Sequence, residues 1–117
     1  MPKRATPGDN RGFLPLSPQV FQVLLSLHEG PQHGYSIIQN IRERTRDEMR
    51  LTASTLYDAL ARLVDQELIQ EVPAPPDVED DDPRRRYYAV TKQGREVTAL
   101  ETRRLQQLVE MAKGLGI

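Results

Sequence analysis

The sequence contains no cysteine, which excludes disulfide bonds, thiolate metal sites and cysteine nucleophiles. It also lacks an apolar run near the ~18 residues that a membrane span requires, and the first twelve residues do not lead into a signal-peptide core. A strong net charge is missing as well: 16 Lys and Arg stand against 17 Asp and Glu in 117 residues, which by itself indicates neither a nucleic-acid binder nor a membrane binder. These absences predict one small domain in a cytoplasmic location.

The near-neutral charge is unevenly distributed. Five of the 17 acids lie in residues 77–82, which leaves 12 acids against 16 bases elsewhere, a formal +4. The surrounding loop, about 73–83, also holds four prolines, so we expect it to be exposed and extended or disordered. This acidic loop runs directly into three arginines, Arg84 to Arg86.

The N-terminal part of the chain predicts a flexible arm followed by a helix. Residues 1–12 are polar and contain two prolines and two glycines, which is typical of a mobile segment. A helix over about 17–29 is then indicated, with Ser17 as its cap and Pro18 at its first position. Gly30-Pro31 ends it.

Two further helices follow. One opens at His33-Gly34 and runs to about 45, and its predicted shared face holds Tyr35, Ile38 and Ile41. The next is capped by Thr52, and its predicted apolar face holds Leu56, Leu60, Leu63 and Val64. The residues expected to point away from the core on this helix are Ser54, Thr55, Asp58, Ala61 and Asp65.

A β-hairpin and a long helix complete the predicted order. Residues 68–72 and 84–90 are short and rich in β-forming side chains, so both are predicted strands. Thr91 can cap a final helix from Lys92 to about 113, although Gly94 weakens its first turn. The fold class is therefore mainly α with a small β-hairpin: a winged helix-turn-helix domain over 13–91 and an additional C-terminal helix over 92–117.

The exposed face of the helix capped by Thr52 carries the functional prediction. Ser54 and Thr55 offer hydroxyl groups to phosphates and base edges, and Tyr57 offers a phenol that can stack or donate. An ordinary solvated face is the alternative. Arg84, Arg85 and Arg86 at the base of the wing are the best candidates for phosphate or minor-groove contact, the alternative being a charged strand edge that prevents aggregation.

Three segments resemble the PadR family of transcriptional regulators: HGYSIIQNI at 33–41, LTASTLYDALARLVDQELIQEV at 51–72 and RRRYYAVTKQGREV at 84–97. The resemblance implies a homodimeric winged-helix repressor whose dimer is built by the C-terminal helix and the first helix. It also implies that Tyr35 and Tyr57 lie near DNA, although Tyr35 could equally be part of the core.

The sequence departs from the family pattern at two positions. Asp58 stands where many members have proline, and its carboxylate either accepts a hydrogen bond from a cytosine amino group, discourages unproductive contacts or is simply solvated. Glu67 stands where a glycine is common, which puts in doubt a tight left-handed turn between helix and strand.

The last helix predicts a homodimer. Its apolar surface exceeds what a core of this size can cover, so burial against a second copy is expected, with packing onto the 17–29 helix of the same chain as the alternative. Two recognition helices about 34 Å apart would then read an inverted repeat in double-stranded DNA. The predicted dimer contacts are Val97, Leu100, Leu105, Leu108, Met111, Ala112 and Leu115.

Other classes of function find little support. His28 and His33 are five residues apart across Gly30-Pro31, whereas a zinc-protease helix needs histidines four apart, so neither a metal site nor an enzyme is predicted. No cofactor is expected. A small-molecule effector is left open, but an aromatic-lined drug site like that of some relatives is not supported, because the chain has no tryptophan. The main alternative is a winged-helix module that binds protein.

Overall fold

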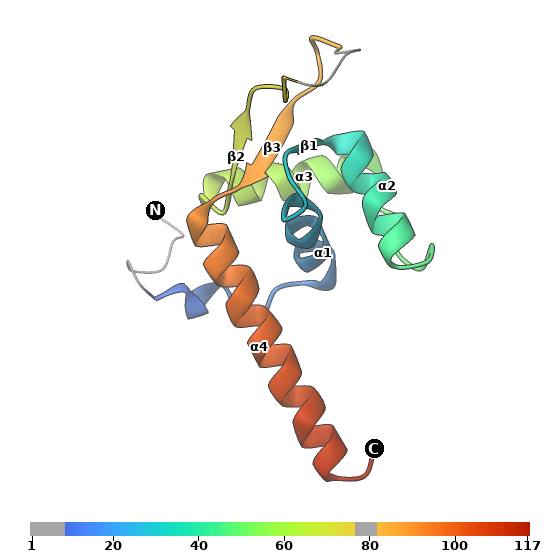
Figure 1. Ribbon diagram of the computed structural model, residues 1–117, viewed down its shortest axis with the longest axis vertical. Helices are drawn as coiled ribbons and strands as arrows, with labels where there is room; N and C mark the ends of the chain where they lie inside the picture. Colours follow the sequence, from blue (N-terminus) through green and yellow to red (C-terminus); the bar gives the residue numbers. More distant parts are fainter. Residues whose placement is uncertain (1–8, 77–81) are drawn as a thin grey trace.

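The computed structural model describes residues 9–76 and 82–117, so most of the predicted arm and the tip of the wing loop lie outside the described residues. The elements in chain order are η1 (Asn10–Phe13), α1 (Pro18–Leu27), β1 (Gln32–His33), α2 (Gly34–Arg44), α3 (Ala53–Asp65), β2 (Ile69–Val72), β3 (Tyr87–Val90) and α4 (Lys92–Gly114). Figure 1 shows the β2–β3 hairpin rising from one end of the molecule, while α4 extends from the other. The predicted winged-helix fold class is confirmed.

Side-chain caps start the helices where the sequence predicts them. Ser17, Thr52 and Thr91 each accept a hydrogen bond from the backbone N–H three residues later, at 3.0–3.1 Å. His33 does the same for α2, because its Nδ1 accepts from the backbone N–H of Ser36 at 3.4 Å. The histidine cap was not predicted.

The sheet has three antiparallel strands in the order β1-β3-β2, one more than the predicted hairpin. Gln32 and His33 pair with Tyr88 and Tyr87, too short a segment to show any periodicity. The ring of His33 also meets that of Tyr87 edge-on, with the ring centroids 5.3 Å apart. β1 thus ties the start of α2 to the wing.

The predicted strand over 84–90 is wrong for its first three residues, since β3 begins at Tyr87. In these three residues, hydrogen bonds of a turn at Asp82 replace the predicted pairing with the other strand. The backbone N–H of Arg85 donates to the Asp82 carbonyl at 2.8 Å, and that of Arg84 donates to the Asp82 carboxylate at 2.9 Å. Arg84, Arg85 and Arg86 therefore lie outside the sheet, between the wing loop (about 73–83) and β3.

The chain passes from α3 into the hairpin through a left-handed turn at Glu67, whose φ is 64°. The backbone N–H of Glu67 donates to Val64 O and that of Leu68 donates to Leu63 O, each at 3.0 Å, which is a Schellman motif. The tight left-handed turn that the missing glycine put in doubt is therefore present, with Glu67 at its left-handed position. The Thr91 hydroxyl reinforces it by donating to Glu67 O at 2.7 Å.

Gly94 has a packing role that offsets its poor helix propensity. A Cβ at this position would overlap the carbonyl oxygen of Leu68 and come within 2.8 Å of Val90. Only glycine lets the first turn of α4 lie directly on the end of the α3–β2 turn.

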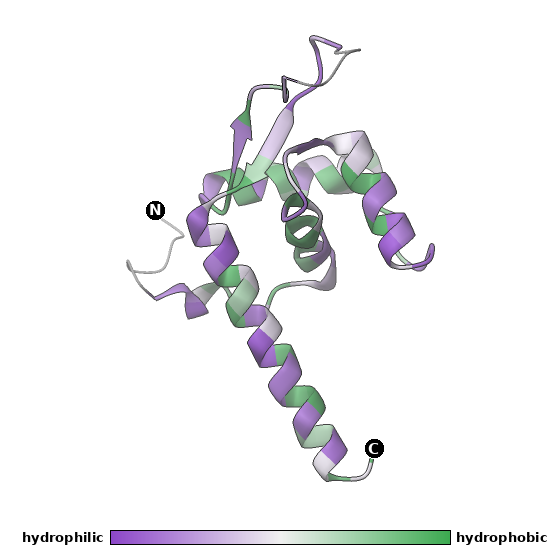
Figure 2. Cartoon of the chain, viewed as in Figure 1, coloured by the Kyte–Doolittle hydropathy of each residue, from purple (hydrophilic) through white to green (hydrophobic). Residues whose placement is uncertain are grey.

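The core lies between α1, α2, α3 and the sheet, where the apolar faces gather (Figure 2). Ile37 and Ile41 are the fully buried residues of α2, whereas Tyr35 is 65% exposed, so the predicted shared face is wrong for the tyrosine. On α3, Val64 is likewise 39% exposed rather than part of the apolar face. The other main core residues are Val23, Leu24, Leu27, Leu56, Leu60, Leu63, Leu68, Ile69, Tyr88, Val90 and Val97.

The segment before α1 is bound to the first half of α4. Asn10 is buried, donates to Glu96 at 2.9 Å and accepts from Gln93 at 3.0 Å. Further on, the backbone N–H of Leu16 donates to the Glu101 carboxylate at 2.9 Å. The last residues of the expected arm thus form a docked 3-10 turn. In the described part of the chain, no helix has the combined length and hydropathy of a membrane span.

Candidate nucleic-acid interface

One face of α3 is turned entirely to solvent. Its central row, which we call the α3 stripe, consists of Ser54, Asp58, Ala61 and Asp65. These residues are spaced four, three and four apart, so they follow one another along the helix surface opposite the core residues. The predicted exposure of this face is confirmed for each of them. The α3 stripe can therefore enter a groove without disturbing the core.

The two hydroxyl residues at the start of α3 differ in what they can offer. Thr55 receives a hydrogen bond from the Thr52 hydroxyl at 3.0 Å, so its side chain is part of the cap. Ser54 makes no side-chain hydrogen bond within residues 9–76 and 82–117, and neither does Asp58 form an ion pair there. Both side chains on the stripe are available to a partner.

The two predicted tyrosines lie on the surface at neighbouring places. Tyr57 is 49% exposed and covers the first residue of α2, where a Cβ on Gly34 would lie 2.8 Å from its Cζ. Gly34 is thus needed for the tyrosine of the next helix to pack closely. Tyr35, one residue on, projects into solvent. Of the two alternatives for Tyr35, the structure supports the surface position.

The wing arginines are exposed but carry carboxylate partners. Arg84 pairs with Asp82 at 3.1 Å, and its hydrogen bonds hold the pKa of the Asp82 carboxyl below its usual value. Arg86 lies 3.7 Å from Glu71 on the neighbouring strand. Arg85 has no ion pair in the described residues. The Glu71 contact was missed because cross-strand register cannot be read from composition.

The basic residues near the end of α2 are also largely paired. Arg42 donates to Asp47 at 2.9 Å, and this hydrogen bond lowers the pKa of the Asp47 carboxyl. Arg50 reaches the same carboxylate at 3.4 Å, and Arg44 pairs with Glu29 at 2.7 Å. The positive charge of this region is therefore largely paired within the chain, at Asp47 in the α2–α3 connection and at Glu29 just after α1.

The predicted dimer residues divide into two groups along α4. Val97 is fully buried in its own chain's core, because the first half of α4 packs against α1 and β3. It is therefore not part of an exposed surface. Leu100 and Ala112 are half-buried. The exposed members are Leu105, Leu108, Met111 and Leu115.

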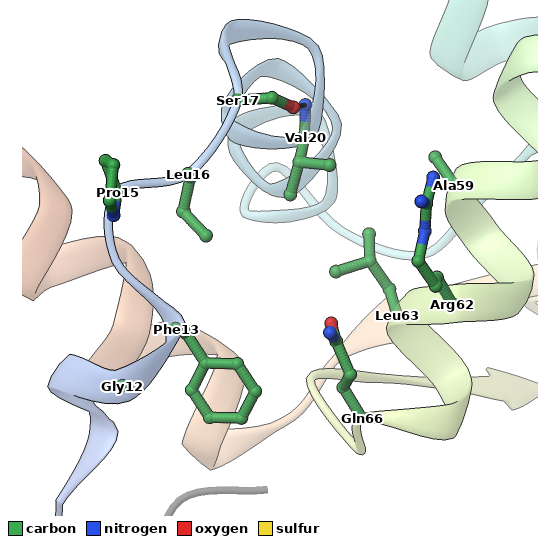
Figure 3. A pocket seen from close by; sticks show the side chains of 10 residues that line it. All are labelled: Gly12, Phe13, Pro15, Leu16, Ser17, Val20, Ala59, Arg62, Leu63 and Gln66. Atoms are coloured by element: carbon green, nitrogen blue, oxygen red, sulfur yellow. Dashed lines mark hydrogen bonds between the residues drawn. The ribbon is translucent and has the colours of Figure 1, made fainter. Parts of the chain in front are cut away.

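A pocket of about 300 Å³ lies between the segment around η1, the start of α1 and the second half of α3. In Figure 3, Leu16, Val20 and Leu63 line the space between these elements, with Phe13 and Gln66 at its edge. The α3 residues that contribute to it lie on the side of the helix away from Tyr57 and Val64. The pocket is therefore separate from the surface that faces the wing.

Each histidine of the rejected metal motif contacts the backbone of its own region. His28 Nδ1 lies 2.7 Å from Leu24 O at the end of α1, and His33 caps α2. His28 therefore lies at the end of α1, and His33 at the start of α2.

Comparisons with known proteins agree with this geometry. Residues 23–100 match the sequence model described as the "Transcriptional regulator PadR-like family". No curated protein matches the chain. A transcriptional regulator from Clostridium thermocellum is similar at 26% identity and a TM-score of 0.67, over 89% of this chain and 93% of that chain.

Two further solved structures share the fold. A PadR-like transcription factor from Bacteroides fragilis is 26% identical with a TM-score of 0.68, over 83% of this chain and 88% of that chain. Bacillus subtilis PadR in complex with operator DNA is 20% identical with a TM-score of 0.60, over 73% of this chain and 46% of that chain.

The matched residues run from α1 into α4 and so include α2, α3 and both strands of the wing. They make up two thirds of the chain. The matched family is one of transcriptional regulators. With its three-helix core, three-stranded sheet and exposed α3 stripe, the chain belongs to the PadR-like family of transcriptional regulators.

Proposed function

We propose that this protein is a homodimeric repressor that binds an inverted-repeat operator, with α3 in the major groove and the wing on the flanking backbone. The observation that carries the proposal is the common location of the candidate contacts. The wing, α3 and the start of α2 lie at one end of the molecule, and the free end of α4 lies at the other (Figure 1). The operator complex of Bacillus subtilis PadR supports DNA as the partner.

Within this proposal the contacts have different roles. Ser54 and Asp58 on the α3 stripe read base edges, and the Asp58 carboxylate accepts a hydrogen bond from a cytosine amino group. Thr55, Tyr57 and Tyr35 lie at the borders of the stripe and contact the backbone. Arg84, Arg85 and Arg86 neutralise phosphates beside the half-site.

The homodimer is supported by two surfaces that suit each other. Leu108 is 47% exposed and Leu115 is 79% exposed on the second half of α4. A groove of about 510 Å³ between α1 and the first half of α4 includes the short side chains of Thr98, Ala99 and Thr102. An isologous contact would place the leucines of each protomer in the groove of the other. Both α3 helices then face one side of the DNA.

The test is the salt dependence of binding to the duplex upstream of the protein's own gene. Replacing Arg85 and Arg86 with glutamine removes two cations, so the slope of log K against log salt should fall by about one unit for each lost contact. Lys113→Gln, at the far end of α4, is the matched control and should leave the slope unchanged. An unaltered slope in the double variant refutes the phosphate role of these arginines. Equal affinity for a shuffled duplex favours a protein-binding module instead.

A further inference from the structure

A groove of about 590 Å³ separates α3 from the wing. Its helix side is formed by Tyr57, Ala61 and Val64 of α3, at spacings of four and three residues, so Ala61 of the α3 stripe also lines the groove. Its wing side carries polar groups from both strands and from the segment before β3: Glu71, Arg84, Arg86 and Tyr88. An apolar wall thus faces a polar wall across a channel that is open to solvent.

Tyr88 brings a hydroxyl group to the polar wall of this groove. Its side chain belongs to the core cluster and is only 7% exposed, so its position is fixed by packing. The hydroxyl makes no hydrogen bond within the described residues. Burial, and then the Glu71 carboxylate directly across the strand pair, raise the pKa of Tyr88, so the group keeps its proton. It is a preorganised donor without a partner.

Arg86 and Glu71 form a loose ion pair on the same wall. Their closest nitrogen and oxygen are 3.7 Å apart, and both side chains are more than half exposed. Exposed pairs of this kind contribute at most about 1 kcal/mol, so a stronger anion can replace the carboxylate. Arg86 and Tyr88 line the same groove, so a phosphate that accepts a hydrogen bond from Arg86 could accept one from the Tyr88 hydroxyl as well.

We propose that this groove binds one phosphodiester of the DNA backbone, held by Arg86 and by the Tyr88 hydroxyl, and that Glu71 is the counter-ion that the phosphate displaces. The proposal rests on the DNA-binding function above and adds three residues to it: Glu71, Val64 and Tyr88. Val64, exposed in spite of being apolar, contacts the deoxyribose on the helix side. Glu71 weakens attraction to DNA in general and so favours sites at which the remaining contacts are correct.

Tyr88→Phe tests the donor. Loss of one hydrogen bond to a charged group should weaken binding to the upstream duplex about tenfold, while the salt slope stays the same because no charge is removed. Tyr87→Phe is the matched control, since it removes the same atom from the adjacent residue of β3, which contacts His33 and does not line the groove. Equal affinities for the two variants overturn the role of the Tyr88 hydroxyl.

Glu71→Gln tests the role of Glu71 as counter-ion. It should increase the affinity for DNA, whereas Tyr88→Phe lowers it, and a misfolded variant would not bind DNA more tightly. Freed from its partner, Arg86 should bind phosphate more tightly at low salt, and the salt slope should steepen by up to about one unit. Glu110→Gln, which removes the same charge on the exposed part of α4, should change neither. A Glu71 variant that behaves like this control refutes the exchange.

Uncharged methylphosphonates, placed one at a time in the duplex, locate the groove on the DNA. We expect one position in each half-site at which unaltered protein and the Tyr88→Phe variant bind equally. If no such position exists, the groove does not hold a phosphodiester although DNA binding itself stands. If the unaltered protein binds no duplex, both this inference and the proposed function fail.

Discussion

The two halves of α4 continue one row of side chains but have opposite surroundings. Gly94, Val97 and Glu101 in the first half are buried against the sheet, α1 and the N-terminal segment. Leu105 and Leu108 follow on the same face, four and seven residues beyond Glu101, and are exposed. A continuous apolar pattern therefore predicts that a face will be covered, but not which chain covers it.

Glu101 marks the boundary between the halves and is the only charged residue in this row. It is 1% exposed, and its carboxylate accepts from Arg104 at 2.6 and 2.9 Å and from the Leu16 backbone N–H at 2.9 Å. Because all these partners come from the same chain, the first half is a site of intrachain stability. The second half, by contrast, supplies the exposed leucines of the proposed dimer contact.

The largest expected effect comes from placing a charge in the second half. Leu108→Glu would put two carboxylates into a symmetric apolar contact, and each unpaired charge there costs several kcal/mol. We expect the dimer dissociation constant to rise more than about a hundredfold, as measured by sedimentation, without loss of helix content. Gln107→Glu introduces the same charge beside the row and should leave the dimer intact. A Leu108→Glu variant that still dimerises would contradict the proposed contact.

A smaller effect, on folding rather than association, is expected in the first half. Glu101→Ala leaves the Arg104 guanidinium and the Leu16 N–H without their acceptor, so the free energy of unfolding should fall by about 2–3 kcal/mol. Urea unfolding measures the change. Glu110→Ala, an exposed position on the same helix, serves as the control and should stay within about 0.5 kcal/mol of the unaltered protein. Similar losses in both variants would erase the distinction between the halves.

The smallest effect concerns pH. Hydrogen bonds from Arg104 hold the pKa of the Glu101 carboxyl below its usual value of 4.5, so the carboxylate contributes stability above that pH. This contribution is lost as the pH falls through the folded-state pKa. Glu101→Gln removes the titrating group, so its urea midpoint should decline less steeply in acid than that of the unaltered protein. Parallel declines would show that the carboxylate adds nothing.

Much of the fold follows from local rules in the sequence. Ser17, Thr52 and Thr91 cap helices because their side chains reach a backbone N–H three residues away, which needs no tertiary information. The exposed face of α3 follows from its helical period in the same way. The exposed α3 surface that we propose to face DNA can therefore be predicted without any long-range contact.

What could not be predicted depends on contacts between distant segments. The strand of Gln32 and His33 exists only through its pairing with β3, and the burial of Val97 depends on the packing of α4 against α1 and β3. The pairing of Arg86 with Glu71 likewise depends on strand register. Glu67 adopts a left-handed turn that sequence alone disfavours, because Thr91 and the end of α3 hold it.

Footprinting on the duplex upstream of the protein's own gene tests the central claim most directly, because it reports sequence preference and dimer geometry together. The account predicts two protected half-sites of inverted sequence, with centres about one helical turn (~34 Å) apart or a multiple of it. It also predicts that both are lost together in the Leu108→Glu variant at concentrations at which the unaltered protein protects them. Uniform protection without half-sites, or two half-sites that persist in that variant, would contradict a dimeric reader of an inverted repeat.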